Sequence, residues 1–238
     1  MMKMMILAPR RGDLSHAEFR RYVTEVHGPL VQSVPEVVRA IRRYHYNFPI
    51  HAAKDTAFHH PSASHLDIVT QGWFDSHAAQ LANMREPRYL EIVRPDEARF
   101  ADTANAVMHY TAEHSVVEGA ATGVKVFYFR RRRAGLSRAE FQEQWQARAA
   151  AALRSNFAFE PTVCKYLQNH TLPESDHPDG AAEKFFDVID EIFIRTPASL
   201  TALADDRAAV ARMAACEEEL LDRSRTRALV TETVVNIA

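Results

Sequence analysis

A histidine stands directly before a glycine and a proline in the segment EVHGPLV, residues 25–31. Imidazole titrates near neutral pH, so His27 could serve as a general base or acid. Helical spacing puts it four residues beyond Val23, at the edge of a buried stripe. Pro29 disfavours helical geometry at Gly28, so we expect the backbone to turn there and the imidazole to face a cavity under the helix. The alternative is a histidine that caps the helix end.

A carboxylate could orient this imidazole. Asp67 opens the predicted strand 65–74, HLDIVTQGWF, in which alternation puts Asp67 and Trp73 on one face. A buried carboxylate needs a partner, and a contact with His27 would orient the ring and raise its basicity. A purely structural role is the alternative, because Asp187 persists in the second half of the chain.

Further polar and aromatic side chains follow on neighbouring predicted strands. Tyr44 and His45 could donate hydrogen bonds to a developing oxyanion, although Tyr44 recurs as Tyr166 and could equally anchor the sheet. The catalytic candidates are therefore His27, Asp67, Tyr44 and His45. Substrate contacts are assigned to Trp73, His109 and Tyr22, although Trp73 also suits the core.

The chain reads as a duplication. An offset of 122 aligns residues 3–19 with residues 125–141, with eight identities, and a two-residue shift is needed farther along. We expect a first unit at 1–117, a linker at 118–123 and a second unit at 124–238. Ten of the twelve histidines lie at or before His114, and ARAAAAL stands where the first unit has EVHGPLV. The first unit is thus predicted to carry the active site, and the second to be a degenerate, mainly structural copy.

Each unit predicts the order βαββαβ. Capping boxes at Ser15–Glu18 and Ser137–Glu140 mark the first helix of each unit. This order is that of a ferredoxin-like α+β fold, whose sheet has helices on one face only. We expect the two ferredoxin-like halves to pack sheet to sheet, as a pseudo-dimeric α+β barrel. The strands are expected at 3–8, 41–48, 65–74 and 106–113, and at 124–129, 163–170, 185–195 and 228–235.

Several spaced motifs of the first unit resemble the EthD family of dimeric α+β barrel proteins. The pattern comprises Leu14, Ser15, Glu18, Phe19, Tyr22, His27, Gly28, Pro29 and Leu30, then Tyr44 and Asn47, then Asp67, Trp73, Phe74 and Asp75, then Asp96, Glu97, Phe100 and Asp102. The resemblance implies a single chain that fuses the two halves other members pair as separate chains. It also implies an active-site role for His27, the usual candidate of the family.

Composition narrows the classes of partner. The formal charge of −2 predicts neither nucleic-acid nor membrane binding, and the run RRRR at 130–133 is typical of a solvated turn. Two cysteines, together with no secretion signal, indicate a cytoplasmic protein. The histidines at 51–65 lack a recognised ligand spacing, and seven glycines leave little for a dinucleotide motif, so no metal and no cofactor are expected. A homodimer remains open.

The sequence favours a cofactor-independent enzyme. It would use His27 for acid/base chemistry on a small hydrophobic, aromatic or polyketide-like carbonyl or phenol compound, as a lyase, cyclase, dehydratase or isomerase. The resemblance implies a cofactor-free monooxygenase as an alternative. A non-catalytic protein that binds a hydrophobic ligand is a second alternative, and haem binding through a histidine is a third.

Overall fold

Eight antiparallel strands close into a barrel in the computed structural model, which describes residues 1–50, 66–175, 185–196 and 198–238. The order around the barrel is β1-β3-β2-β8-β5-β7-β6-β4. The pairs β2–β8 and β4–β6 join the halves, so neither half has a free sheet edge. The strands are β1 (Met2–Ala8), β2 (Arg43–Pro49), β3 (Ile68–Phe74), β4 (Val107–Val117), β5 (Val124–Arg130), β6 (Val163–Thr171), β7 (Val188–Ile194) and β8 (Arg227–Ile237).

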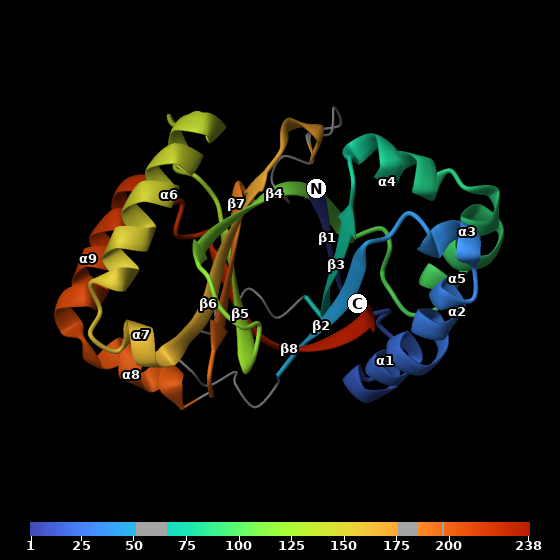
Figure 1. Ribbon diagram of the computed structural model, residues 1–238, viewed down its shortest axis with the longest axis horizontal. Helices are drawn as coiled ribbons and strands as arrows, with labels where there is room; N and C mark the ends of the chain where they lie inside the picture. Colours follow the sequence, from blue (N-terminus) through green and yellow to red (C-terminus); the bar gives the residue numbers. More distant parts are fainter. Residues whose placement is uncertain (51–65, 176–184, 197) are drawn as a thin grey trace.

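The helices cover the outside of the barrel on two opposite sides (Figure 1). In the first half they are α1 (His16–Tyr22), the π-helical turn η1 (Val23–His27), α2 (Gly28–Gln32), α3 (Pro35–Val38), α4 (His77–Met84), a second π-helical turn η4 (Tyr89–Val93) and α5 (Arg94–Glu97). In the second half they are α6 (Arg138–Arg154), α7 (Phe159–Thr162), α8 (Ser199–Asp205) and α9 (Arg207–Leu220). Both predicted capping boxes are present, at the starts of α1 and α6. The predicted pseudo-dimeric α+β barrel is therefore confirmed.

The two halves repeat each other in strand register. Met5 on β1 pairs with Gln71, and Phe127 on β5 pairs with Glu191. The offset is thus 122 at the first strand and 120 at the third, as the aligned sequence predicts. This register allows positions in the two halves to be compared directly.

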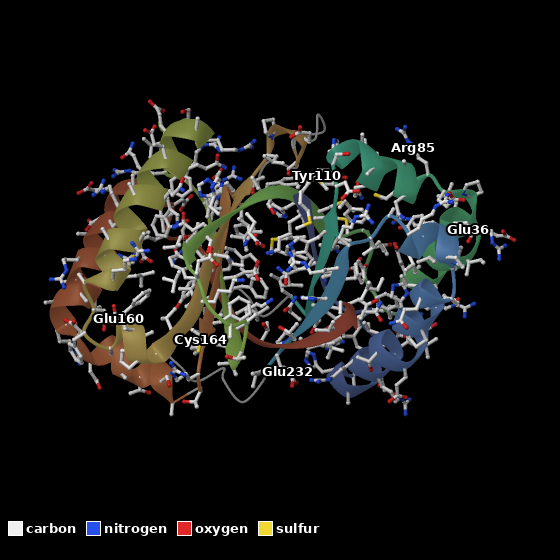
Figure 2. All side chains as sticks on the ribbon, in the orientation of Figure 1. Glu36, Arg85, Tyr110, Glu160, Cys164 and Glu232 are labelled. Atoms are coloured by element: carbon white, nitrogen blue, oxygen red, sulfur yellow. The ribbon has the colours of Figure 1, made fainter. Side chains whose placement is uncertain are left out.

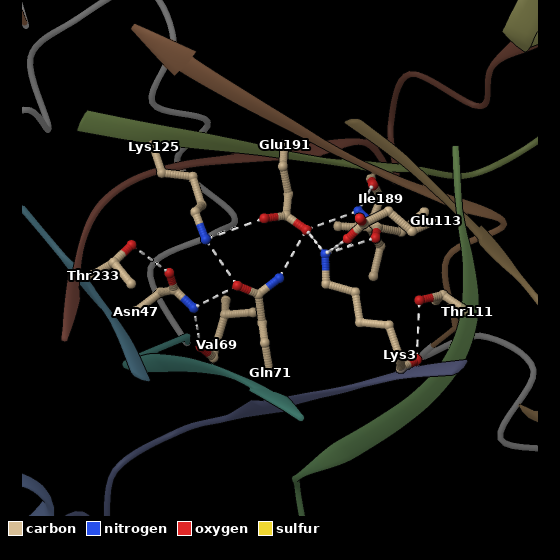
Figure 3. Close-up of polar contacts among 11 residues, drawn as sticks. Lys3, Asn47, Val69, Gln71, Thr111, Glu113, Lys125, Ile189, Glu191 and Thr233 are labelled. Atoms are coloured by element: carbon tan, nitrogen blue, oxygen red, sulfur yellow. Dashed lines mark hydrogen bonds and ion pairs between the residues drawn. The ribbon is translucent and has the colours of Figure 1, made fainter. Parts of the chain in front are cut away.

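Alternate residues of each strand point into the barrel, and side chains fill that interior (Figure 2). Its centre is polar. Glu191 accepts hydrogen bonds from Lys3 and from Gln71 Nε2 at 2.7 Å, and its other oxygen lies 3.1 Å from Lys125 Nζ (Figure 3). Asn47 and Asn169, at equivalent positions, donate to the carbonyl oxygens of Val69 and Ile189. The network joins the two halves through the middle of the molecule.

No helix within the described ranges is long and apolar enough to cross a membrane.

Candidate active site

The helix that carries His27 does not end at Gly28–Pro29, contrary to the prediction. His27 and Gly28 both have helical backbone angles, and α1, η1 and α2 run on without a break. The Gly28 N–H bonds to the carbonyl of Val23, five residues earlier, which makes this turn π-helical. A proline has no N–H, and its ring collides with the carbonyl four residues before it. The wider turn accommodates Pro29 inside the helix.

A second π-helical turn followed by a proline occurs in the helical segment formed by η4 and α5. The π-helical turn η4 ends at Val93, and Pro95 follows two residues later, just as Pro29 follows His27. The Arg94 N–H again bonds to a carbonyl five residues earlier. The corresponding helices α6 and α9 contain no proline and are regular. Single π turns inside α-helices are frequent at functional sites.

His27 is buried, with 4 % of its surface exposed, and its Nδ1 lies 3.0 Å from Oδ2 of Asp96. Its ring packs against that of Phe100, with the centroids 4.6 Å apart. Burial lowers the pKa of His27, and the hydrogen bond to Asp96 opposes this shift only in part. The ring is therefore neutral near pH 7. With the Nδ1 proton donated to the carboxylate, Nε2 is left as the basic nitrogen.

Asp96 lies on α5 and is held from a second side. The hydroxyl of Tyr22 donates to Oδ1 of Asp96 at 2.7 Å. One carboxylate oxygen thus serves His27 and the other serves Tyr22, and Asp96 itself is 5 % exposed. Tyr22, predicted as a substrate contact, is placed instead where it positions Asp96.

A small cavity of about 50 Å³ lies between His27 and the outer face of the first sheet. Tyr44 contributes to its wall, and burial raises the pKa of Tyr44 well above the ordinary value, so its hydroxyl keeps its proton. Glu97 lies opposite and accepts a hydrogen bond from Tyr89 at 2.7 Å. Much of the remaining wall is apolar and includes Met4, Ile6, Val31, Phe74, Met84, Val93 and Met108. A neutral imidazole and a neutral phenol therefore line one partly open, mostly apolar space.

The predicted contact between Asp67 and His27 is wrong. Asp67 precedes β3 and accepts from the Arg10 backbone N–H at 2.9 Å, while its Oδ1 lies 2.8 Å from His16 Nδ1. Asp187 does the same in the second half, accepting from the Arg132 N–H at 2.8 Å. Both aspartates fix the turn that follows the first strand of their half. The persistence of this residue in both halves thus reflects a structural role.

His45 does not share the cavity with His27, because Tyr44 and His45 are consecutive on β2 and point to opposite faces. His45 points into the barrel, where its ring lies 4.9 Å from that of Trp73. Burial lowers the pKa of His45 to about 4, and nearby Lys125 and Arg43 add to the effect. His45 and Trp73 thus belong to the barrel interior and not to the His27 cavity.

His109 also lies inside the barrel, fully buried, on the same side of the sheet as Met5. Its Nε2 accepts the backbone N–H of Phe186 at 3.0 Å, and its ring packs against Phe185 with the centroids 5.1 Å apart. Burial lowers the pKa of His109 to about 3. This residue is a neutral acceptor in the core, so its predicted contact with substrate has no geometric support.

Asp96 received no catalytic role from the sequence, although it belongs to the motif DEARF. The bridge pairs Arg10–Ala101 and Arg132–Leu221 place Cys216 where the first half has Asp96. Alanine, at Ala149, stands in the place of His27. The second half thus lacks counterparts of both His27 and Asp96. That joint absence was visible in the sequence and would have identified the pair.

No group of three or more potential metal ligands is present among the described residues. The histidines at positions 51, 59, 60 and 65 fall outside that part of the chain. The chemistry that the described side chains offer at His27 is proton transfer.

Comparison with known proteins agrees with this architecture. The model of the EthD domain family matches residues 11–104, which include His27, Tyr44 and Asp96. A conidial pigment biosynthesis dehydratase EthD of Metarhizium robertsii is 33% identical over 110 residues, which cover 43% of this chain and 75% of that protein. The dehydratase aurZ of Gibberella zeae is 32% identical over 111 residues, covering 43% and 70%.

Solved structures extend the likeness to the whole chain. An anthrone oxidase-like protein superposes with a TM-score of 0.63 at 9% identity, covering 99% of this chain and 93% of that one. A chlorite dismutase variant from Candidatus Nitrospira defluvii has a TM-score of 0.51 at 12% identity, covering 97% and 91%. The closed barrel with helices on both outer faces defines a pseudo-dimeric α+β barrel protein. By its matched domain and its relatives, the chain belongs to the EthD family.

Proposed function

We propose that this protein is a cofactor-independent dehydratase that removes water from a small hydroxylated carbonyl compound of aromatic or polyketide type. Both curated relatives are enzymes, named as dehydratases, which agrees with the predicted enzyme of lyase type. The observation that carries the proposal for this chain is the Asp96–His27 pair, which leaves Nε2 as the basic nitrogen of a histidine that lines a cavity.

The proposed elimination needs one base and one hydrogen-bond donor. Nε2 of His27 removes a proton from the carbon next to the carbonyl, and the Tyr44 hydroxyl donates to the oxygen on which negative charge develops. The enolate then re-forms the carbonyl and expels the hydroxyl at the next carbon. The imidazolium returns its proton to that hydroxyl, so that a carbon–carbon double bond and one water are formed. Asp96 stabilises the imidazolium between these two steps.

The cavity of about 50 Å³ is much smaller than a substrate of this class. Three of its wall residues are methionines: Met4, Met84 and Met108. Their unbranched side chains change rotamer at low cost and adapt to different shapes. We therefore expect the substrate to enter by displacing methionine side chains, while His27 stays fixed by Asp96.

The proposal is tested with two histidine variants and a hydroxylated polyketide-type ketone, by following loss of water with mass spectrometry. His27→Ala should lower kcat by about 10²–10⁴-fold, the usual contribution of a general base. His45→Ala is the matched control, since His45 is close in sequence to Tyr44 but points into the barrel. It should retain activity. Full activity in His27→Ala, or a ligand that binds and is recovered unchanged, would show that His27 is not the base of a dehydratase.

A further inference from the structure

The second half has a partly open cavity of about 800 Å³ between the outer face of its sheet and the helices α6, α8 and α9. It occupies the place that the small cavity beside His27 has in the first half. The sequence comparison predicted a structural copy here, and nothing in the proposed dehydration uses this space. The volume lies within the range typical of small-molecule sites.

Three wall positions of this cavity carry smaller side chains than their counterparts in the first half. Met108 pairs with Ile6 in the first half, and Ala228 pairs with Tyr128 in the second, so Ala228 takes the position of Met108. By the same register Val126 replaces Met4, and Ile194 replaces Phe74. Val126, Ile194 and Ala228 thus leave more room at their positions than the first half has, whereas Tyr128 fills more space than its counterpart Ile6.

Aromatic side chains form one end of the cavity. Tyr128, Trp145 and Tyr166 contribute to its wall together with aliphatic residues of the sheet and helices. The Arg130 guanidinium lies 4.5 Å from the ring centroid of Tyr128 and 4.8 Å from that of Trp145. The sequence suggested a solvated turn for this arginine, but its side chain is buried at the base of the cavity. Flat aromatic walls favour a flat ligand.

At this end of the cavity the Arg130 guanidinium already has two carboxylates as partners. Arg130 contacts Asp190 through Nε at 3.1 Å and Glu217 through Nη1 at 2.7 Å. Asp190 also accepts from Trp145 Nε1 at 3.2 Å and from the Tyr166 hydroxyl at 3.1 Å. An anionic ligand at this end would therefore meet two carboxylates beside the Arg130 guanidinium. The other two arginines of the wall, Arg223 and Arg227, are more exposed than Arg130. The guanidinium of Arg130 can donate to a neutral oxygen acceptor in the cavity.

We propose that the second half binds an uncharged aromatic molecule carrying a carbonyl or phenolic oxygen, in a site separate from that of His27. The aromatic body fills the apolar part of the cavity, and its oxygen accepts a hydrogen bond from Arg130. The helices of the two halves lie on opposite sides of the barrel, so the two sites do not share a wall (Figure 1).

Fluorescence of Trp145 can report occupancy, because the chain has two tryptophans and Trp73→Phe leaves only this one. The probe is 2-naphthol, with 2-naphthoate as a matched anion. We expect saturable quenching by 2-naphthol and at least tenfold weaker binding of 2-naphthoate. No saturable quenching by 2-naphthol, or tighter binding of the carboxylate, would overturn the proposal.

Two further variants locate the site. Ala228→Met restores the residue that the first half has at this position and should weaken 2-naphthol binding at least tenfold, with dehydration unchanged. Ala214→Leu fills the cavity from α9 and should do the same if Ala228→Met fails to fold. His27→Ala should lose turnover and bind 2-naphthol as before, which separates this proposal from the dehydratase. Unchanged binding in a folded cavity-filling variant, or loss of turnover in it, would refute a separate second-half site.

Discussion

The Asp96 carboxylate accepts from the proposed base through His27 Nδ1 and, with its other oxygen, from the Tyr22 hydroxyl. In Asp96→Asn one of these contacts must face an amide N–H₂, which fixes neither the tautomer nor the orientation of the ring. We expect kcat to fall by about 10²–10⁴-fold, as when an orienting carboxylate is removed from a catalytic triad. The measurement is the steady-state rate of dehydration.

The pH profile separates this positioning role from simple loss of structure. Asp96 raises the pKa of His27 against the effect of burial, so the acidic limb of kcat/KM should move to lower pH in Asp96→Asn. Asp102→Asn, in the same sequence motif but with no contact to His27, should keep both rate and profile. An unshifted limb in a folded Asp96→Asn variant would mean that His27 is not the group that titrates.

The lowered pKa of His109 leads to a prediction of how the free energy of unfolding depends on pH. Its pKa is about 3 in the folded protein, below the ordinary 6.5, so unfolding takes up a proton between these pH values. The contribution of neutral His109 to the free energy of unfolding is therefore complete above pH 6.5 and is lost as the pH falls toward 3. His109→Gln keeps an acceptor for the Phe186 N–H but does not titrate. Relative to wild type it should gain roughly 2 kcal/mol in free energy of unfolding between pH 7 and pH 4.5, measured by urea unfolding at each pH; a constant difference would contradict this.

At the residue scale, comparison of the two halves singled out His27, which has no counterpart in the second half. The structure places His27 and Tyr44 on the wall of one cavity, and their catalytic roles stay predictions. Sequence reasoning failed for Asp67 and His45. Both faces of a barrel strand are buried, so alternation does not reveal which face meets the helices and which meets the barrel interior. That ambiguity put Tyr44 and His45 together in one predicted site.

At the scale of elements, the π-helical turn distinguishes the helix of His27 from α6. A π turn contains one residue more than a regular turn. Deletion of Glu25, which is exposed, should convert η1 to a regular turn and rotate His27 away from Asp96. We expect turnover to fall at least a hundredfold, while the free energy of unfolding falls by about 3 kcal/mol, because Pro29 then meets the carbonyl that the wider turn avoids.

Deletion of Glu143 is the matched control, since it removes an exposed glutamate from the regular helix α6. There the deletion shifts buried Trp145 out of register and should destabilise the protein strongly. Thermal unfolding of both variants checks this contrast. Equal destabilisation by the two deletions would show that the π turn is no easier to shorten than a regular helical turn.

Element boundaries followed well from capping residues and apolar alternation, because both are local. The serine at each helix start and the strands on either side are present as expected. The π turns were not predicted, since the helical segment 16–32 is as long as α6 and keeps buried residues at helical spacing. Pro29 therefore suggested a helix end, when the structure widens a single turn around it.

For the whole molecule, the duplication predicted the barrel, and it also explains the network at the centre. Lys3 and Lys125 occupy equivalent positions, and so do Gln71 and Glu191. The two lysines are thus related by the duplication, whereas the Glu191 carboxylate between them has only an amide as its counterpart. Burial acts to raise the pKa of Glu191, but Lys3 and Lys125 outweigh it and hold the pKa below the ordinary value. A second carboxylate, Glu113, lies 2.8 Å from Lys3 and completes the charge balance.

This symmetry yields a prediction for the barrel interior. Glu191→Gln leaves two buried lysines with a single partly exposed carboxylate and should lower the free energy of unfolding by about 3–5 kcal/mol. Adding Gln71→Glu moves the carboxylate to the equivalent position, where Lys125 already donates to Gln71 at 2.8 Å. The double variant should recover at least half of the lost free energy of unfolding, measured by chemical denaturation.

Glu113→Gln, which removes the more exposed carboxylate, should lower the free energy of unfolding by less than Glu191→Gln does. If the double variant is no more stable than Glu191→Gln alone, the central network depends on local packing in the second half and not on the symmetry of the duplication.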